Sequence, residues 1–390
     1  MQAPSLAQVD TLYSADSIEF CPHPGFEQWF TCGTYQLLKP EDQAKADAEA
    51  RGEDAGEDAG ASAPAGDASA PSATSAVASA DASDSDGDAD SEPDYTPPAP
   101  RVGRLYLYAL DGTTPVESQR IETAAILDAK WSPHAPDTPE LGVADAKGGL
   151  SVYSLSGGAL SLSERYALAD DDTLVLSLDW GAPNELVTSL SDGTLAHVVR
   201  RPSGLATAAS WAAHDFEPWV AAWAGPDSVW SGGDDCKLKR WDVRVPDTPV
   251  FVNRRFDAGV TTISPSPHAE HLLAVGSYDA QLRIFDARKA TVPLADVELP
   301  GGIWRTRWHP SASRAGDILN ATMHGGFAVV RLPTGLATAD DPAGSHEAEI
   351  IKTFPGTLGY GADWCRRDDG DESVVATCSF YDHVMHVWRA

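Results

Sequence analysis

Short segments in which apolar and polar residues alternate recur along most of the chain, and each ends in an anchor residue. Six of these anchors are Trp131, Trp180, Trp223, Pro265, Trp308 and Trp364. The steps between them are 49, 43, 42, 43 and 56 residues. A repeat with a period near forty residues predicts one architecture built from similar units.

A seventh unit lies upstream, where "ADSIEF" places Phe20 in the anchor position. Phe20 precedes Trp131 by 111 residues, and a sixty-residue acidic tract between them accounts for the excess, since 51 residues remain without it. The chain therefore contains seven repeats.

Each anchor is followed by two further alternating segments that are joined by a turn, as in "SVWSGGDDCKLKRWD" (228–242) and "LLAVGSYDAQLRIFD" (272–286). Alternation with period two, interrupted every eight to twelve residues by a turn, predicts antiparallel strands. Four strands per unit, with Trp-Asp or Phe-Asp closing the third, indicate propeller blades. We predict an all-β, seven-bladed β-propeller of WD repeats. "WSGGDDCK" is then a turn, and it has neither the pattern of a phosphate-binding loop nor a following helix.

Such a ring has to be closed, because the last blade would otherwise leave an edge strand exposed. The chain ends two residues after Trp388, so the outer strand of the seventh blade has to come from elsewhere. We predict that it comes from the N-terminus, around Val9 to Ala15.

Composition places an insertion within a single propeller of residues 1–390. Residues 41–100 consist largely of Ala, Ser, Gly, Pro and Asp, and their sixteen acidic residues against two basic ones give −14 of the net charge of −30. This tract is predicted to be disordered, because it has too little apolar surface to offset the entropy of ordering it. An inert insertion is the simpler interpretation, and an acidic recruiting arm is the alternative.

The charge and the cysteines restrict the class of protein. A net charge of −30 argues against nucleic acid as a partner and favours a basic or cationic one. No signal peptide and no run of eighteen apolar residues occurs, so no membrane is expected. Five cysteines without a CxxC pair indicate neither a disulfide framework nor a zinc site, and a reducing cytoplasm is expected.

Candidate site residues are gathered by the geometry of a propeller, in which the turns between second and third strands share one face with the starts of the innermost strands. Residues predicted there include Trp304, Arg305, His324, Tyr360, Asp382, His383 and the turn aspartates Asp192, Asp234, Asp235 and Asp279. For most of these aspartates, bonding to the amides of their own turn is the simpler role. His324 and His383 stand where other blades have Asp and would present an imidazole to the channel mouth.

No established catalytic or metal-binding pattern accompanies these residues. The chain has no G-x-S-x-G elbow and no His/Cys cluster at metal-ligand spacing, so no metal is expected. Cys378 and Ser379 lie in a predicted strand and are an alternative nucleophile. On residue chemistry alone, a noncatalytic scaffold that recruits a basic or methylated protein is favoured.

Several segments taken together resemble the WD-repeat diphthine methyl ester hydrolases of diphthamide biosynthesis. They are "YSADSIEFCP", "WSGGDDCKLKRWDVR", "GGIWRTRWHP", "MHGGF", "YGADW" and "ATCSFYDHVMHVW". The resemblance is firmest from residue 230 to the end of the sequence. It implies a cytoplasmic carboxylic ester hydrolase without a cofactor, whose protein substrate is translation elongation factor 2. We expect it to act as a monomer.

The substrate that the resemblance implies carries a quaternary ammonium group, which aromatic rings can hold by cation-π contact. The residues predicted to bind this substrate are Trp304, Tyr278, Tyr381, Tyr360, Asp235 and Asp279. For hydrolysis, we expect His324 or His383 as the general base, Asp382 or Asp234 as its orienting carboxylate and Arg305 as the electrophilic partner. A methyltransferase is less favoured, because no glycine-rich cofactor loop follows a strand.

Overall fold

The computed structural model describes residues 1–38, 99–333, 336, 347–367 and 372–390. The predicted insertion at 41–100 therefore lies outside the described residues, except for its last two. The chain falls into two compact units, Met1–Gln36 with Arg101–Ala390, and Leu37–Pro100. Within the described residues, no helix has the length and hydropathy needed to cross a bilayer.

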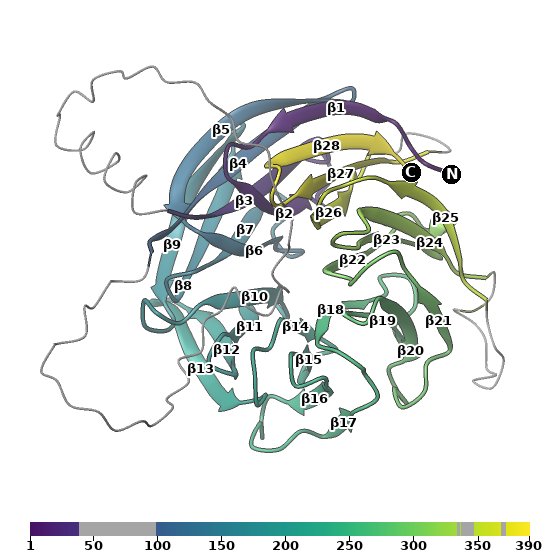
Figure 1. Ribbon diagram of the computed structural model, residues 1–390. Helices are drawn as coiled ribbons and strands as arrows, with labels where there is room; N and C mark the ends of the chain where they lie inside the picture. Colours follow the sequence, from purple (N-terminus) through teal and green to yellow (C-terminus); the bar gives the residue numbers. More distant parts are fainter. Residues whose placement is uncertain (39–98, 334–335, 337–346, 368–371) are drawn as a thin grey trace, which may run out of the picture. The chain divides into compact units, whose positions relative to one another are not determined.

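Seven four-stranded antiparallel sheets surround a common centre (Figure 1), which confirms the predicted all-β, seven-bladed propeller. The innermost strands are β2 (Ser14–Phe20), β6 (Ile126–Trp131), β10 (Val175–Trp180), β14 (Val220–Trp223), β18 (Val260–Pro265), β22 (Arg305–Trp308) and β26 (Gly359–Trp364). All seven predicted anchors are the last residues of these strands.

In each sheet, the second, third and outer strands follow the innermost strand in order toward the outside of the ring. The second strands are β3 (Trp29–Leu37), β7 (Glu140–Asp145), β11 (Glu185–Leu190), β15 (Ser228–Gly232), β19 (Leu272–Ser277), β23 (Asp317–Ala321) and β27 (Val374–Ser379). The third are β4 (Arg101–Asp111), β8 (Gly149–Ser156), β12 (Thr194–Arg201), β16 (Leu238–Asp242), β20 (Gln281–Asp286), β24 (Phe327–Arg331) and β28 (Val384–Arg389). The outer strands are β5 (Thr114–Ala124), β9 (Ala159–Ala167), β13 (Gly204–Ala212), β17 (Phe251–Asn253), β21 (Ala295–Glu298), β25 (Glu349–Phe354) and β1 (Ser5–Asp10).

The recurrence of tryptophan at the anchors has a physical reason. The indole N–H of Trp131 donates to the carbonyl of Glu19 at 3.1 Å, and that of Trp180 donates to the carbonyl of Lys130 at 2.8 Å. Trp308 and Trp364 repeat this contact with the blade before them. Each of these side chains thus fills the space between two blades and satisfies its polar atom there.

The ring is closed by the N-terminal strand, as predicted, but only Val9 and Asp10 of the predicted range belong to that strand. β1 pairs with β28 from Ser5 opposite Trp388 to Asp10 opposite Val384, whereas the prediction placed this strand at Val9 to Ala15. β1 ends at Asp10 because the chain turns there. Asp10 Oδ1 accepts the backbone N–H of Leu12 at 2.8 Å, and Leu12 has a φ of 64°. This turn separates β1 from β2, which already begins at Ser14.

Candidate active site at the mouth of the channel

One residue of each blade, four positions before its anchor, occupies an equivalent place at the start of the innermost strand. These seven residues, the mouth ring, are Asp16, Leu127, Leu176, Trp219, Thr261, Trp304 and Tyr360. At Asp16, Leu127, Leu176 and Thr261 the pairing between first and second strands shifts by one residue, as at a β-bulge. The same local irregularity therefore recurs around the ring.

Aromatic residues of the mouth ring contact one another. The rings of Trp304 and Tyr360 have centroids 4.6 Å apart, and those of Trp304 and Trp219 are 5.4 Å apart. Tyr278, in the turn after β19, lies 6.2 Å from Trp304 and 6.4 Å from Trp219. Trp219 and Trp304 can meet because the residue between them in the ring is the small Thr261, whose hydroxyl bonds the carbonyl of Ile303.

Two further aromatic residues extend this cluster. The ring centroid of Phe380 lies 4.9 Å from that of Tyr360, and the ring centroid of Tyr381 lies 5.6 Å from that of Phe380. Tyr381 is 67% exposed, so it marks the solvent edge of the cluster. The aromatic residues predicted to bind substrate, Trp304, Tyr278, Tyr360 and Tyr381, are thus brought together by the fold.

Asp234, a predicted orienting carboxylate, belongs to the same cluster. The indole N–H of Trp219 donates to Asp234 Oδ1 at 2.7 Å. Burial raises the pKa of Asp234 although this hydrogen bond opposes the shift, and Glu217 and Asp235 raise it further. The aromatic rings therefore have an acidic neighbour that a cation would stabilise in its charged form.

Arg305, which follows Trp304 in the chain, forms an ion pair with a carboxylate of another blade. Its guanidinium lies 3.2 Å from Asp128 Oδ1. Both groups act on Asp16, whose pKa is lowered by Arg305 and raised by Asp128. Burial raises the pKa of Asp16 to about 8, against the effect of Arg305. Asp16 was not among the predicted site residues. A feature of the sequence could have identified it. When the seven units are aligned on their anchors, Asp16 stands four residues before Phe20, the position of Trp304 and Tyr360 in their units.

Asp235 is engaged in a buried network. His214 Nδ1 lies 2.8 Å from Asp235 Oδ1, His214 Nε2 lies 2.7 Å from Ser231 Oγ, and the indole of Trp241 donates to the same oxygen at 2.8 Å. Lys239 pairs with Asp235 at 3.1 Å. The order Ser-His-Asp is that of a catalytic triad, but Ser231 is fully buried. Substrate binding by Asp235 stays a prediction, and its contacts give it a structural role.

The remaining predicted polar residues lie in turns. Asp279 pairs with Arg283 at 2.8 Å, and Asp382 accepts a hydrogen bond from Thr357 at 2.8 Å. His383 has φ 57°, and its carbonyl accepts the backbone N–H of Thr11 at 2.8 Å. His324 is exposed and has no hydrogen bond or ion pair within the described part of the chain. The catalytic roles of both histidines stay predictions.

The alternative nucleophiles are buried. Burial strongly raises the pKa of the Cys378 thiol, which disfavours the thiolate. Ser379 Oγ accepts the backbone N–H of Leu358 at 3.0 Å. Across the described ranges, no group of three or more His, Cys, Asp or Glu residues is placed to hold a metal ion.

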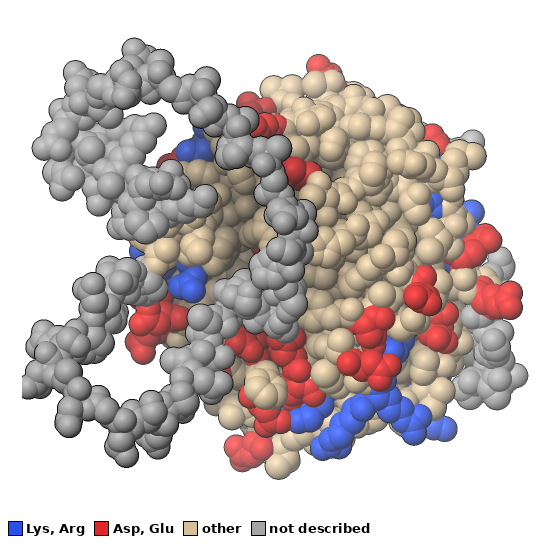
Figure 2. Space-filling model, viewed as in Figure 1, with Lys and Arg blue, Asp and Glu red and all other residues tan. Residues whose placement is uncertain are grey.

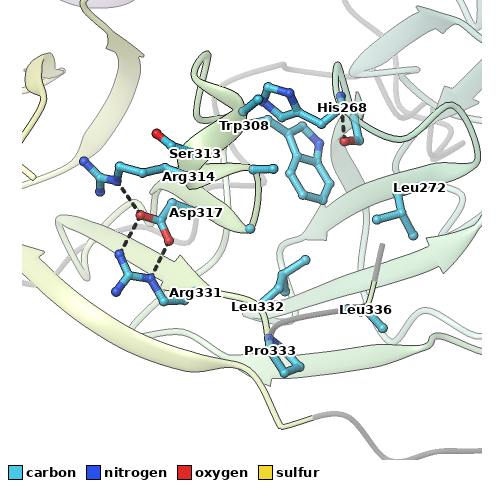
Figure 3. Close-up of a pocket in the computed structure, with 14 residues that line it drawn as sticks. His268, Leu272, Trp308, Ser313, Arg314, Asp317, Arg331, Leu332, Pro333 and Leu336 are labelled. Atoms are coloured by element: carbon cyan, nitrogen blue, oxygen red, sulfur yellow. Dashed lines mark hydrogen bonds and ion pairs between the residues drawn. The ribbon is translucent and has the colours of Figure 1, made fainter. Parts of the chain in front are cut away.

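A cavity of about 440 Å³ lies at the opposite end of the innermost strands, beyond the anchors of β18 and β22 (Figure 3). Its walls include Leu272, Trp308 and Leu332. The charged residues on its other side neutralise one another, since Arg314 and Arg331 both contact Asp317 at 2.6 to 2.8 Å. None of the predicted site residues lines it. We therefore place the candidate site at the mouth ring, where titratable and aromatic groups meet.

Comparison with known proteins gives several relatives. Diphthine methyltransferase of Homo sapiens is 35% identical, with coverage of 99% of this chain and 98% of that protein. Diphthine methyltransferase of Mus musculus is 35% identical over 92% of this chain and 69% of that protein, and the homolog of Dictyostelium discoideum is 34% identical over 68% and 76%. No protein-family model matches the chain. A chain in the crystal structure of the mitotic checkpoint complex has a TM-score of 0.57 at 18% identity, over 75% of this chain and 84% of its own, and shows the fold alone.

Proposed function

Because the chain belongs to the diphthine methyltransferase family, we propose that it acts in diphthamide biosynthesis as a carboxylic ester hydrolase. The substrate is the methyl ester of methylated diphthine on translation elongation factor 2, and the products are methanol and the free carboxylate. Hydrolysis is favoured over methyl transfer because the sequence has no glycine-rich loop between a strand and a helix that would bind a nucleotide cofactor.

The observation that carries this proposal is the cluster of Trp219, Tyr278, Trp304 and Tyr360 beside Asp234. A quaternary ammonium has no N–H to donate, so it is recognised by aromatic faces and by nearby negative charge. Diphthine carries such a group at a fixed distance from its ester. Binding the cation at the mouth ring would hold the ester close to Asp16 and Arg305.

Incubation of the purified protein with methylated elongation factor 2 tests the activity. We expect release of methanol at the rate at which the ester disappears. Production of S-adenosylhomocysteine from added S-adenosylmethionine would instead indicate a methyltransferase. Binding of the modified protein without any turnover would favour the noncatalytic scaffold.

Substitutions separate binding from chemistry. Tyr360→Ala should raise KM for the methylated substrate, because a cation-π contact contributes about 0.5–2 kcal/mol. His324→Ala and His383→Ala test the predicted general bases, each of which would contribute about 10²–10⁴-fold to the rate. Asp382→Asn and Asp234→Asn test the orienting carboxylates in the same assay, and Arg305→Lys tests the electrophilic partner.

A further inference from the structure

Two buried polar atoms of the mouth ring have no hydrogen-bond partner among the described residues, Asp16 Oδ1 and Trp304 Nε1. Asp16 is only 3% exposed, and a carboxylate oxygen that loses water without gaining a donor is costly. One atom is an acceptor and the other a donor. A ligand that supplies both a donor and an acceptor at this ring would satisfy them together.

Asp16 differs in this respect from other acids of the innermost strands. Asp128 Oδ2 accepts the backbone N–H of Leu178 at 3.1 Å, Asp179 Oδ2 accepts that of Trp223 at 2.8 Å, and Asp363 Oδ2 accepts that of Phe20 at 2.8 Å. These three carboxylates join neighbouring blades. Asp16 is also the single acid in the mouth ring, next to the aromatic cluster through Tyr360.

We propose that Asp16 is the general base of the hydrolysis and that the indole N–H of Trp304 stabilises the oxyanion. This rests on the proposed function. Asp16 takes a proton from a water molecule whose oxygen attacks the ester carbonyl carbon, and the carbonyl oxygen, now negative, accepts a hydrogen bond from Trp304. When the C–O bond to the methoxy group breaks, Asp16 returns the proton to the leaving oxygen. Ester and water thus give carboxylic acid and methanol.

The titration of Asp16 suits a base that works near neutral pH. Its folded pKa of about 8 means that the basic form increases as pH rises toward that value. The groups that face it are Asp128 from β6, Arg305 from β22, Tyr360 from β26 and Cys378 from β27. Of these, Arg305 favours the carboxylate and Asp128 disfavours it.

The test compares Asp16→Asn with the unaltered protein, using single-turnover methanol release across pH and a separate binding measurement with methylated elongation factor 2. Asn keeps the shape and removes the base. We expect a loss of about 10²–10⁴-fold in the chemical step, disappearance of the rise in rate toward pH 8, and unchanged Kd. Asp179→Asn, another buried acid of an innermost strand, is the control and should keep the rate and the pH profile.

Trp304→Phe tests the second half, since it keeps an aromatic ring and removes the N–H. We expect kcat to fall by about 10²–10³-fold with a much smaller change in KM. Full activity of Asp16→Asn, with an unchanged pH profile, would overturn the role of Asp16, and unchanged kcat in Trp304→Phe would overturn that of Trp304. If the unaltered protein releases no methanol, the proposed function itself fails, which is a different result.

Discussion

The role of an acidic residue in this ring depends on its distance from the anchor of its blade. One residue before the anchor, Asp179 and Asp363 accept backbone N–H groups of the following blade. Four residues before it, Asp16 reaches the mouth ring and has an oxygen without a partner in the described structure. Similar residues in the same kind of strand are therefore either structural or available for chemistry.

Asp16→Asn should alter the dependence of stability on pH. The folded protein holds a proton on Asp16 up to about pH 8, whereas the unfolded chain releases it near its ordinary pKa of about 3.8. The folded state thus binds more protons across this window, and its stability declines as pH rises through it. In the Asn variant this decline should be absent, so that thermal denaturation at pH 8 shows a melting temperature equal to or above that of the unaltered protein. A lower melting temperature at every pH would contradict this assignment.

Ser231→Ala tests whether the buried Ser-His-Asp arrangement is structural. The change removes an oxygen that contacts both His214 and Trp241, so it should lower the free energy of unfolding by about 1–3 kcal/mol. Urea denaturation measures this loss. Ser228→Ala, at the half-buried start of the same strand, should cost less. Methanol release should be unchanged in both variants, and its abolition by Ser231→Ala would instead identify a nucleophile.

At the scale of elements, alternation and anchor spacing predicted the seven sheets, since both depend on local sequence. The closing strand begins and ends earlier than predicted, because the turn at Asp10 to Leu12 ends β1 within the predicted range. The predicted aromatic residues did meet, since equivalent turns share one face. Asp16 was missed because the sequence does not reveal which carboxylates find backbone donors in a neighbouring blade.

Removal of residues 1–10 should destabilise the whole ring, because it takes the outer strand from the last sheet. The backbone hydrogen bonds that join β1 to β28 would be lost, at about 0.5–1.5 kcal/mol each, and the edge of β28 would be exposed. Circular dichroism during heating should show a much lower or less cooperative transition. Addition of a peptide of residues 1–10 should restore part of the stability.

A point variant controls for changes that leave this pairing intact. Leu6→Ser alters a side chain that is 44% exposed and lies where the register between β1 and β28 shifts. It should melt close to the unaltered protein. A truncated chain with an unchanged melting temperature would refute the closure of the ring by this strand.

At the scale of the whole molecule, charge is distributed unevenly. Acidic side chains gather over the region of β15 to β20, with basic side chains along its rim (Figure 2). Together with the net charge of −30, this favours slow association with acidic partners and faster association with basic surfaces. The sign of the net charge follows from the sequence, whereas the location of the acidic and basic side chains on the surface follows from the fold.

Replacement of residues 41–98 by a short Gly-Ser linker tests the predicted insertion. A short linker can join the flanking residues, because the backbone N–H of Leu38 donates to the carbonyl of Pro100 at 3.0 Å. Melting temperature and methanol release should both stay the same. A large rise in KM for the protein substrate, with stability unchanged, would support the recruiting arm.

The pairing of β1 with β28 also governs when the protein can mature. β1 is synthesised before the strands of the other six blades, and its partner β28 is synthesised after them. The edge of β28 therefore pairs with a strand that was made long before it. Contacts of such long sequence separation form slowly, so newly made chains should depend on chaperones until β1 and β28 have paired.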